Sequence, residues 1–154
     1  MKQSKKAFLN YMVINTRHIG LVVNNLDSTI KFYNSLGFKV INRKIEQGEY
    51  IEKLVKIKDV KLEWVKLKLI DDSILELLKY HGNEKKLNKP LQKSNKFGWS
   101  HISFTVKSII NTIKIINENG GKADNNFQFS PDGKVKVLYC NDIEGNILEI
   151  VEEI

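Results

Sequence analysis

Hydrophobic and polar positions along the 154-residue chain follow the same order twice. A short apolar run typical of a strand comes first, then apolar residues at helical spacing, then three more strand-like runs. We therefore expect two modules, each with one strand, one helix and three further strands. The strand-like runs are His18–Val23, Phe38–Ile45, Val60–Ile70 and Ser73–Tyr80 in the first module, and His101–Val106, Ala123–Phe129, Val135–Cys140 and Asn146–Glu152 in the second.

Both expected helices carry an apolar stripe and end on glycine. The stripe consists of Leu26, Ile30, Phe32 and Tyr33 in the first helix, and of Ile109, Ile110, Ile113 and Ile116 in the second. Gly37 is expected to adopt the left-handed conformation after the first helix, and Asn119-Gly120-Gly121 to end the second.

A sequence repeat supports this division into modules. A shift of 83 positions superimposes residues 18–37 on residues 101–120 with eight identities in 20 positions, and a shift of 73 superimposes residues 74–77 on residues 147–150. We expect an N-terminal extension over residues 1–15 and a single domain over residues 16–154. Within that domain the predicted parts are module one (16–81), a polar, lysine-rich linker (82–97) and module two (98–154).

Each module opens on a histidine and closes on a glutamate within an apolar strand. These residues are His18 and Glu76 in module one, and His101 and Glu149 in module two. A glutamate among apolar neighbours is costly to bury unless it is paired or binds a metal, and here it occurs twice at equivalent positions. If the modules pair about a pseudo-twofold axis, the four side chains converge and suit one divalent metal ion. Ni, Co or Zn is favoured, Mn or Fe(II) also fits, and two coordination positions stay open.

Composition narrows the classes of partner. The net charge is +7, but only Arg17 and Arg43 are arginines, and the 23 lysines are spread along the chain. Scattered lysines favour a solvated surface over a nucleic-acid interface, and they leave attraction of small anionic substrates as an alternative. No apolar run approaches the length of a membrane span. Cys140 is the only cysteine and is expected to be a buried, reduced thiol, which favours the cytoplasm.

Other polar residues have simpler interpretations. His81 has no counterpart in module two and is expected at the surface or the rim of the site. Asp132 and Asp142 occur in turn sequences. The insertion over residues 46–58 is expected to form a short packing helix, rather than a lid, with Tyr50, Leu54 and Ile57 on one side. A nucleophile-elbow motif and a phosphate-binding glycine loop are both absent from the sequence.

Several motifs of the chain resemble the vicinal oxygen chelate superfamily, which includes glyoxalase I, methylmalonyl-CoA epimerase, extradiol dioxygenases and antibiotic-resistance proteins. The resemblance covers residues 16–152 and rests on His18–Val23, Asn25–Tyr33, Leu36–Phe38, Ile74–Leu78, Ser100–Val106 and Asp142–Glu149. It implies an α+β fold of two tandem βαβββ modules that form a cupped mixed sheet around a metal site, and often a homodimer. Whether the modules pair within one chain or across two is open.

The order His, Glu, His, Glu is similar to glyoxalase I, whose metal ligands would map onto His18, Glu76, His101 and Glu149. This resemblance implies a lyase or isomerase that moves a proton next to a carbonyl of a small oxygen-chelating substrate, such as a thiol adduct of a 2-oxoaldehyde. Glu149 and Glu76 would be its base and acid. The alternatives are an Fe(II) dioxygenase, an acyl-CoA epimerase and a non-catalytic drug-binding resistance protein. The chain departs from the family pattern at Ile143 and Glu144, which we expect to be harmless, and in the insertion.

Overall fold

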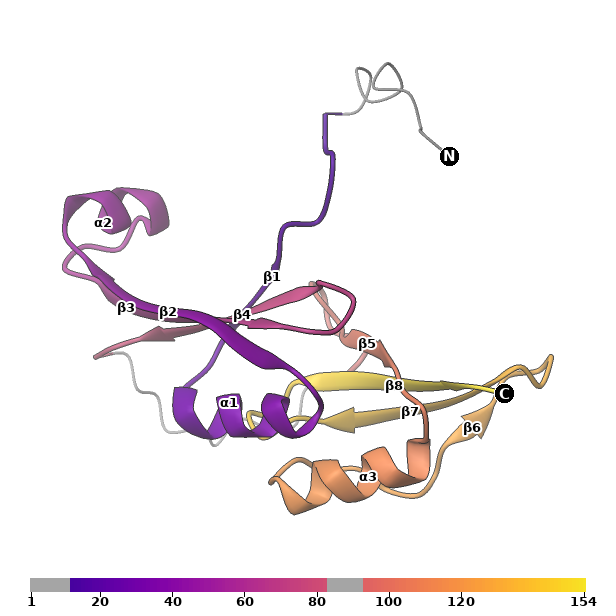
Figure 1. The fold of residues 1–154 in the computed structure, drawn as a ribbon. Helices are drawn as coiled ribbons and strands as arrows, with labels where there is room; N and C mark the ends of the chain where they lie inside the picture. Colours follow the sequence, from indigo (N-terminus) through magenta and orange to yellow (C-terminus); the bar gives the residue numbers. More distant parts are fainter. Residues whose placement is uncertain (1–11, 83–92) are drawn as a thin grey trace.

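The computed structural model describes residues 12–82 and 93–154, and within them both modules have the expected order of elements (Figure 1). Module one comprises β1 (Ile19–Val22), α1 (Leu26–Ser35), β2 (Lys39–Gln47), α2 (Glu49–Val55), β3 (Lys61–Lys68) and β4 (Ile74–Tyr80). Module two comprises β5 (Ile102–Thr105), α3 (Ile109–Glu118), β6 (Gln128–Phe129), β7 (Val135–Asn141) and β8 (Ile147–Glu153). Most of the predicted extension and linker lies outside the described residues.

Each module forms its own four-stranded mixed sheet, with the same strand order in both. The orders are β1-β4-β3-β2 and β5-β8-β7-β6. The first strand of each module pairs in parallel with the last, and the other pairs are antiparallel. The α+β fold with a βαβββ repeat is thereby confirmed, as two sheets of four strands.

The helices end where the sequence indicated, and each begins at a polar cap. Asn25 accepts a hydrogen bond from the Ser28 amide at the start of α1, and Ser108 accepts one from the Asn111 amide at the start of α3. Gly37 has φ of 103°, as predicted. The prediction was wrong for one residue of the stripe: Ile110 is 54% exposed, and Thr112 lies on the buried face of α3 instead.

The predicted strand Ala123–Phe129 is much shorter than expected. Only β6 pairs regularly, because the preceding backbone is bound to side chains instead. The amide and carbonyl of Ala123 bond to the carboxamide of Asn117, and the Asn126 amide bonds to the Asp124 carboxylate. Such local side-chain bonds compete with pairing between strands.

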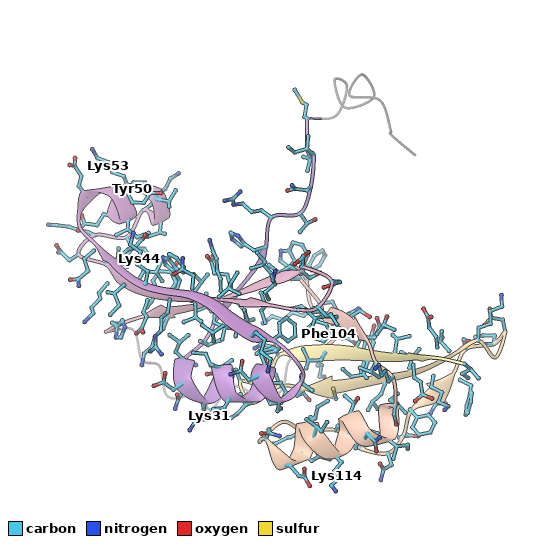
Figure 2. The ribbon with its side chains drawn as sticks, viewed as in Figure 1. Lys31, Lys44, Tyr50, Lys53, Phe104 and Lys114 are labelled. Atoms are coloured by element: carbon cyan, nitrogen blue, oxygen red, sulfur yellow. The ribbon has the colours of Figure 1, made fainter. Side chains whose placement is uncertain are left out.

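Helix α1 of module one packs against the turn between β7 and β8 of module two. A single apolar core spans both modules, and its aromatic contact between them joins Phe38 and Phe104 with ring centroids 5.6 Å apart. Figure 2 shows Phe104 close to the end of α1 where the modules meet. The hydroxyl of buried Tyr33 donates to Asp142 at 2.9 Å, and Glu144 accepts bonds from the backbone amides of Asn24 and Asn25.

The insertion is a packing helix, α2, at the tip of the β2–β3 hairpin (Figure 1). Ile51 packs on Val60 and Leu62 in a small core separate from the main one. The side predicted to pack was wrong, since Tyr50 and Leu54 are 69% and 61% exposed. The residues of α2 that pack on this small core, Ile51 and Val55, do have helical spacing, but the stripe lies one residue further along than the predicted Tyr50 and Leu54. Among the described residues, no helix has the length and apolar character needed to cross a membrane.

Candidate functional site

In module one, His18 and Glu76 lie side by side. His18 directly precedes β1, and the parallel register that pairs Gly20 with Glu76 brings the imidazole next to the carboxylate. The distance from His18 Nε2 to Glu76 Oε2 is 3.1 Å. Leu75 and Leu77 belong to the core under α1, so Glu76 between them lies on the opposite face of the sheet.

Module two repeats this arrangement. His101 directly precedes β5, and the register pairs Ser103 with Glu149 of β8. The distance from His101 Nε2 to Glu149 Oε2 is 3.5 Å. The buried residues Leu148 and Ile150 flank Glu149, which lies on the face of its sheet away from α3. The repeat in sequence is therefore a repeat in space.

The structure brings the four residues together as two pairs and not as one cluster. We call His18 with Glu76, and His101 with Glu149, the two half-sites. In the part of the chain that is described, no three His, Cys, Asp or Glu side chains lie close enough to hold one metal ion. Both histidines border a cavity of about 380 Å³ between β1 and β5, but neither glutamate does.

Each half-site fits the donor chemistry of a divalent metal. Two ligand atoms about 2.1 Å from a shared ion lie about 3.0 Å apart at an octahedral angle and about 3.4 Å apart at a tetrahedral one. The separations in the half-sites match these values, and they also suit a hydrogen bond between histidine and glutamate. In addition, His18 Nδ1 is buried without a hydrogen-bond partner. The half-sites thus present paired nitrogen and oxygen donors, two of the three or four ligands that a metal site needs.

Lys66 lies next to the module-one half-site and was not singled out from the sequence. The antiparallel register pairs Lys66 of β3 with Glu76, and the ammonium nitrogen is 3.5 Å from Glu76 Oε1. The same nitrogen lies 4.9 Å from the centre of the Trp64 ring. The alternation of side chains along this strand was visible in the sequence, but the register that places Lys66 against Glu76 was not.

Tyr139 occupies the equivalent position in module two. It pairs with Glu149 in the sheet, and its ring centroid is 4.9 Å from that of His101. Burial, and then the negative charge of Glu149, raise the pKa of the Tyr139 hydroxyl above its ordinary value. The phenol therefore remains protonated near neutral pH and presents a neutral hydroxyl beside the half-site.

The other candidate residues have structural roles. The His81 side chain is 28% exposed, and its Nε2 is 3.0 Å from buried Glu63, which also accepts bonds from Arg43. Cys140 is buried, as predicted, and desolvation raises its pKa to about 12. Asp142 is a turn residue, as expected, and also bonds to Tyr33 across the module boundary.

Comparison with known proteins identifies the family. The sequence matches the Glyoxalase/Bleomycin resistance protein/Dioxygenase superfamily over residues 16–150. The chain belongs to this superfamily. No curated protein matches the sequence significantly.

Solved structures share the fold at low sequence identity. A glyoxalase family protein from Bacillus cereus has a TM-score of 0.83 and 19% identity, covering 95% of this chain and 98% of its own. A fosfomycin resistance protein, FosX, from Listeria monocytogenes has a TM-score of 0.59 and 17% identity, covering 93% and 96%. Glyoxalase I from Zea mays has a TM-score of 0.61 and 19% identity, covering 88% of this chain and 46% of its own. At these identities the likeness concerns the fold, so the activity of this superfamily member must be argued from its own residues.

Proposed function

We propose that the protein is a divalent-metal-dependent lyase or isomerase, similar to glyoxalase I, that moves a proton next to a carbonyl of a small oxygen-chelating substrate. The observation that carries this proposal is the duplicated half-site. Two His–Glu pairs occupy equivalent positions on equivalent strands, each on the sheet face away from its own module's helix. Two imidazoles and two carboxylates form a ligand set suited to Ni, Co or Zn, and also to Mn or Fe(II).

We further propose that a second copy of the chain completes the site. One chain contributes His18 and Glu76, and its partner contributes His101 and Glu149, so that a homodimer contains two complete sites. This arrangement is supported by the separation of the half-sites within one chain, where no three donor side chains meet among the described residues. A twofold axis would generate both sites at once, because each chain presents both half-sites.

The chain's own residues would divide the work in this site. His18, Glu76, His101 and Glu149 hold the metal, which supplies Lewis-acid polarisation of the substrate oxygens when bound. Glu149 would take the proton from the carbon next to the carbonyl, and Glu76, entering the step protonated, would give a proton to the neighbouring carbon; exchange of one proton with solvent at each carboxyl group would then restore both starting states. Tyr139, whose raised pKa keeps it protonated, is placed beside Glu149 to donate a hydrogen bond to substrate oxygen.

The base is tested by the isosteric variant Glu149→Gln. Its amide oxygen still offers a neutral donor but cannot accept the substrate proton, so we expect turnover of a 2-oxoaldehyde thiol adduct to fall about 100-fold or more. The metal content of the variant is measured in parallel. Full activity in a variant that retains its metal would exclude Glu149 as the base.

The shared site is tested by mixing two inactive variants. One carries His18→Ala with Glu76→Ala, and the other carries His101→Ala with Glu149→Ala. If the sites form between subunits, each variant alone has no complete site, whereas the mixed dimer has one. Random exchange of subunits should then restore about a quarter of the wild-type activity and metal content. If each chain completed its own site, the mixture would remain as inactive as its components.

A further inference from the structure

A second cavity, of about 300 Å³, opens beside the module-one half-site. Asn15, Thr16, Arg17, His18, Lys66 and Ile74 line it. Two of these side chains are cations and none is a carboxylate. The cavity is therefore a basic hollow that borders directly on one of the proposed metal ligands.

The positive charges of Lys66 and Arg17 are not fully paired with carboxylates of the described residues. Lys66 Nζ is 3.5 Å from Glu76 Oε1, longer than the roughly 2.7–2.9 Å of a charge-assisted hydrogen bond, and the side chain is 25% exposed. Among the described residues, no ion-pair partner of Arg17 occurs. Lys66 and Arg17 outnumber Glu76 at this edge of the sheet, so the hollow, with exposed Arg17 on its rim, has a local excess of positive charge.

The repeat shows that these cations are not needed to build a module. Ser100 stands at the position equivalent to Arg17, and Tyr139 at the position equivalent to Lys66. A cavity of about 200 Å³ in module two is lined by Tyr139 and Ile147, the equivalents of Lys66 and Ile74, and has no lysine or arginine among the described residues that line it. Because the same βαβββ module forms without them, the cations of module one call for a role other than folding.

We infer that this hollow binds an anionic group of the substrate, a carboxylate or a phosphate-type oxyanion, through Lys66 and Arg17. The inference rests on the proposed function for the placement of the reacting part of the substrate at the adjoining half-site. The bond itself is an oxyanion held by an ammonium and a guanidinium, and it needs no metal. The substrate is thereby narrowed to small oxygen chelators that carry a separate negative group.

The test is a titration of metal-free protein with inorganic phosphate, and separately with acetate, followed by 1H–15N NMR. The chain has two tryptophans, so their indole signals separate the hollow from the rest of the protein. Trp64 lies under Lys66, and we expect its indole signal and the Arg17 amide signal to shift in a saturable way. Tighter binding of phosphate would indicate a phosphate-type group, and equal or tighter binding of acetate a carboxylate.

Variants assign the binding to the two cations. Lys66→Met keeps the aliphatic side chain and should raise the Kd about tenfold or more, and Arg17→Met should also weaken binding. Lys66→Arg should restore the Kd to within about threefold of wild type. Lys68→Met is the matched control, since Lys68 lies on the same face of β3 but pairs with Asp72 outside the hollow, and its Kd should be unchanged. The dispersion of each spectrum shows that the variant is folded.

Three results would overturn the inference: no saturable shift at Trp64 and Arg17, equal weakening in Lys66→Met and Lys68→Met, or unchanged affinity in Lys66→Met. Metal content, measured on the same variants, keeps the two proposals apart. Phosphate binding without any metal uptake would leave the anion site standing and remove the metalloenzyme. Metal uptake without phosphate binding would do the reverse.

Discussion

The hydroxyl of Tyr33 offers a quantitative test of how the modules are held together. Tyr33 is fully buried, and its hydroxyl donates to Asp142 Oδ2 at 2.9 Å. Asp142 is 2% exposed and also accepts bonds from the Asn146 amide and carboxamide and from the Glu144 amide. In Tyr33→Phe the edge-on ring contacts with Phe32 and Phe38 remain, so the variant removes one hydrogen bond from a buried carboxylate.

The expected cost follows from the charge and burial of the acceptor. A hydrogen bond to a charged group contributes about 1.5–3 kcal/mol, so the free energy of unfolding should fall by about 2 kcal/mol. For a protein of this size that loss corresponds to a decrease in Tm of about 5 °C. Burial raises the pKa of Asp142, and the bond from Tyr33 opposes this rise, so the variant should have a still higher Asp142 pKa.

The pH dependence of that cost gives a second signature. A carboxyl whose pKa is higher in the folded state costs stability at neutral pH, and the cost disappears as pH falls through the folded pKa towards the ordinary value of 3.8. The destabilisation by Tyr33→Phe should therefore be larger at pH 7 than at pH 4.

The assay is urea unfolding at a fixed protein concentration, followed by tryptophan fluorescence, with Tyr50→Phe as the control. Tyr50 is 69% exposed, and loss of its hydroxyl should change stability by less than about 0.5 kcal/mol. Equal effects of the two variants, or an effect of Tyr33→Phe that grows towards acid pH, would refute this account of the module boundary.

Three further predictions concern other parts of the fold. Burial raises the pKa of Glu63, but hydrogen bonds from Arg43 and His81 outweigh this effect and lower the pKa below its ordinary value. The wild type should therefore be more stable than Glu63→Gln by its full margin above pH 4.5. This margin should shrink in acid unfolding curves as the pH falls through the pKa that Glu63 has in the folded state. Gly121→Ala would place a methyl group 2.7 Å from the Asn141 carbonyl oxygen, so thermal unfolding should show a loss of about 2 kcal/mol or more. Cys140, with its pKa raised to about 12, should resist thiol reagents in the native protein and react promptly in urea.

The sequence repeat predicted the order of elements in each module and the face of the sheet on which each glutamate lies, because both depend on local pattern and strand alternation. The histidine and glutamate of each module fall on neighbouring strands of one sheet, and this proximity follows once the first and last strands pair in parallel. The pairs His18–Glu76 and His101–Glu149 were therefore within reach of the sequence. Among the described residues the two pairs do not meet within one chain, so the shared metal site belongs to the proposed function.

The relation between the modules was not within reach of the sequence. It depends on contacts between residues about 120 positions apart, such as Asn24 with Glu144, which no local pattern encodes. Glu144 was interpreted as a harmless departure, yet its carboxylate accepts bonds from two backbone amides at the start of α1. The place of Lys66 beside Glu76 likewise depends on strand register, because a slip of a single residue would move Lys66 to the other face of the sheet.

Elemental analysis shows whether His18, Glu76, His101 and Glu149 hold one divalent metal ion. Untagged protein purified without chelator is compared with His101→Ala. We expect about one equivalent of Ni, Co, Zn, Mn or Fe per chain in the wild type and its loss in the variant. Wild-type protein that contains no such metal, and takes none up on titration, would show that these four residues are not metal ligands.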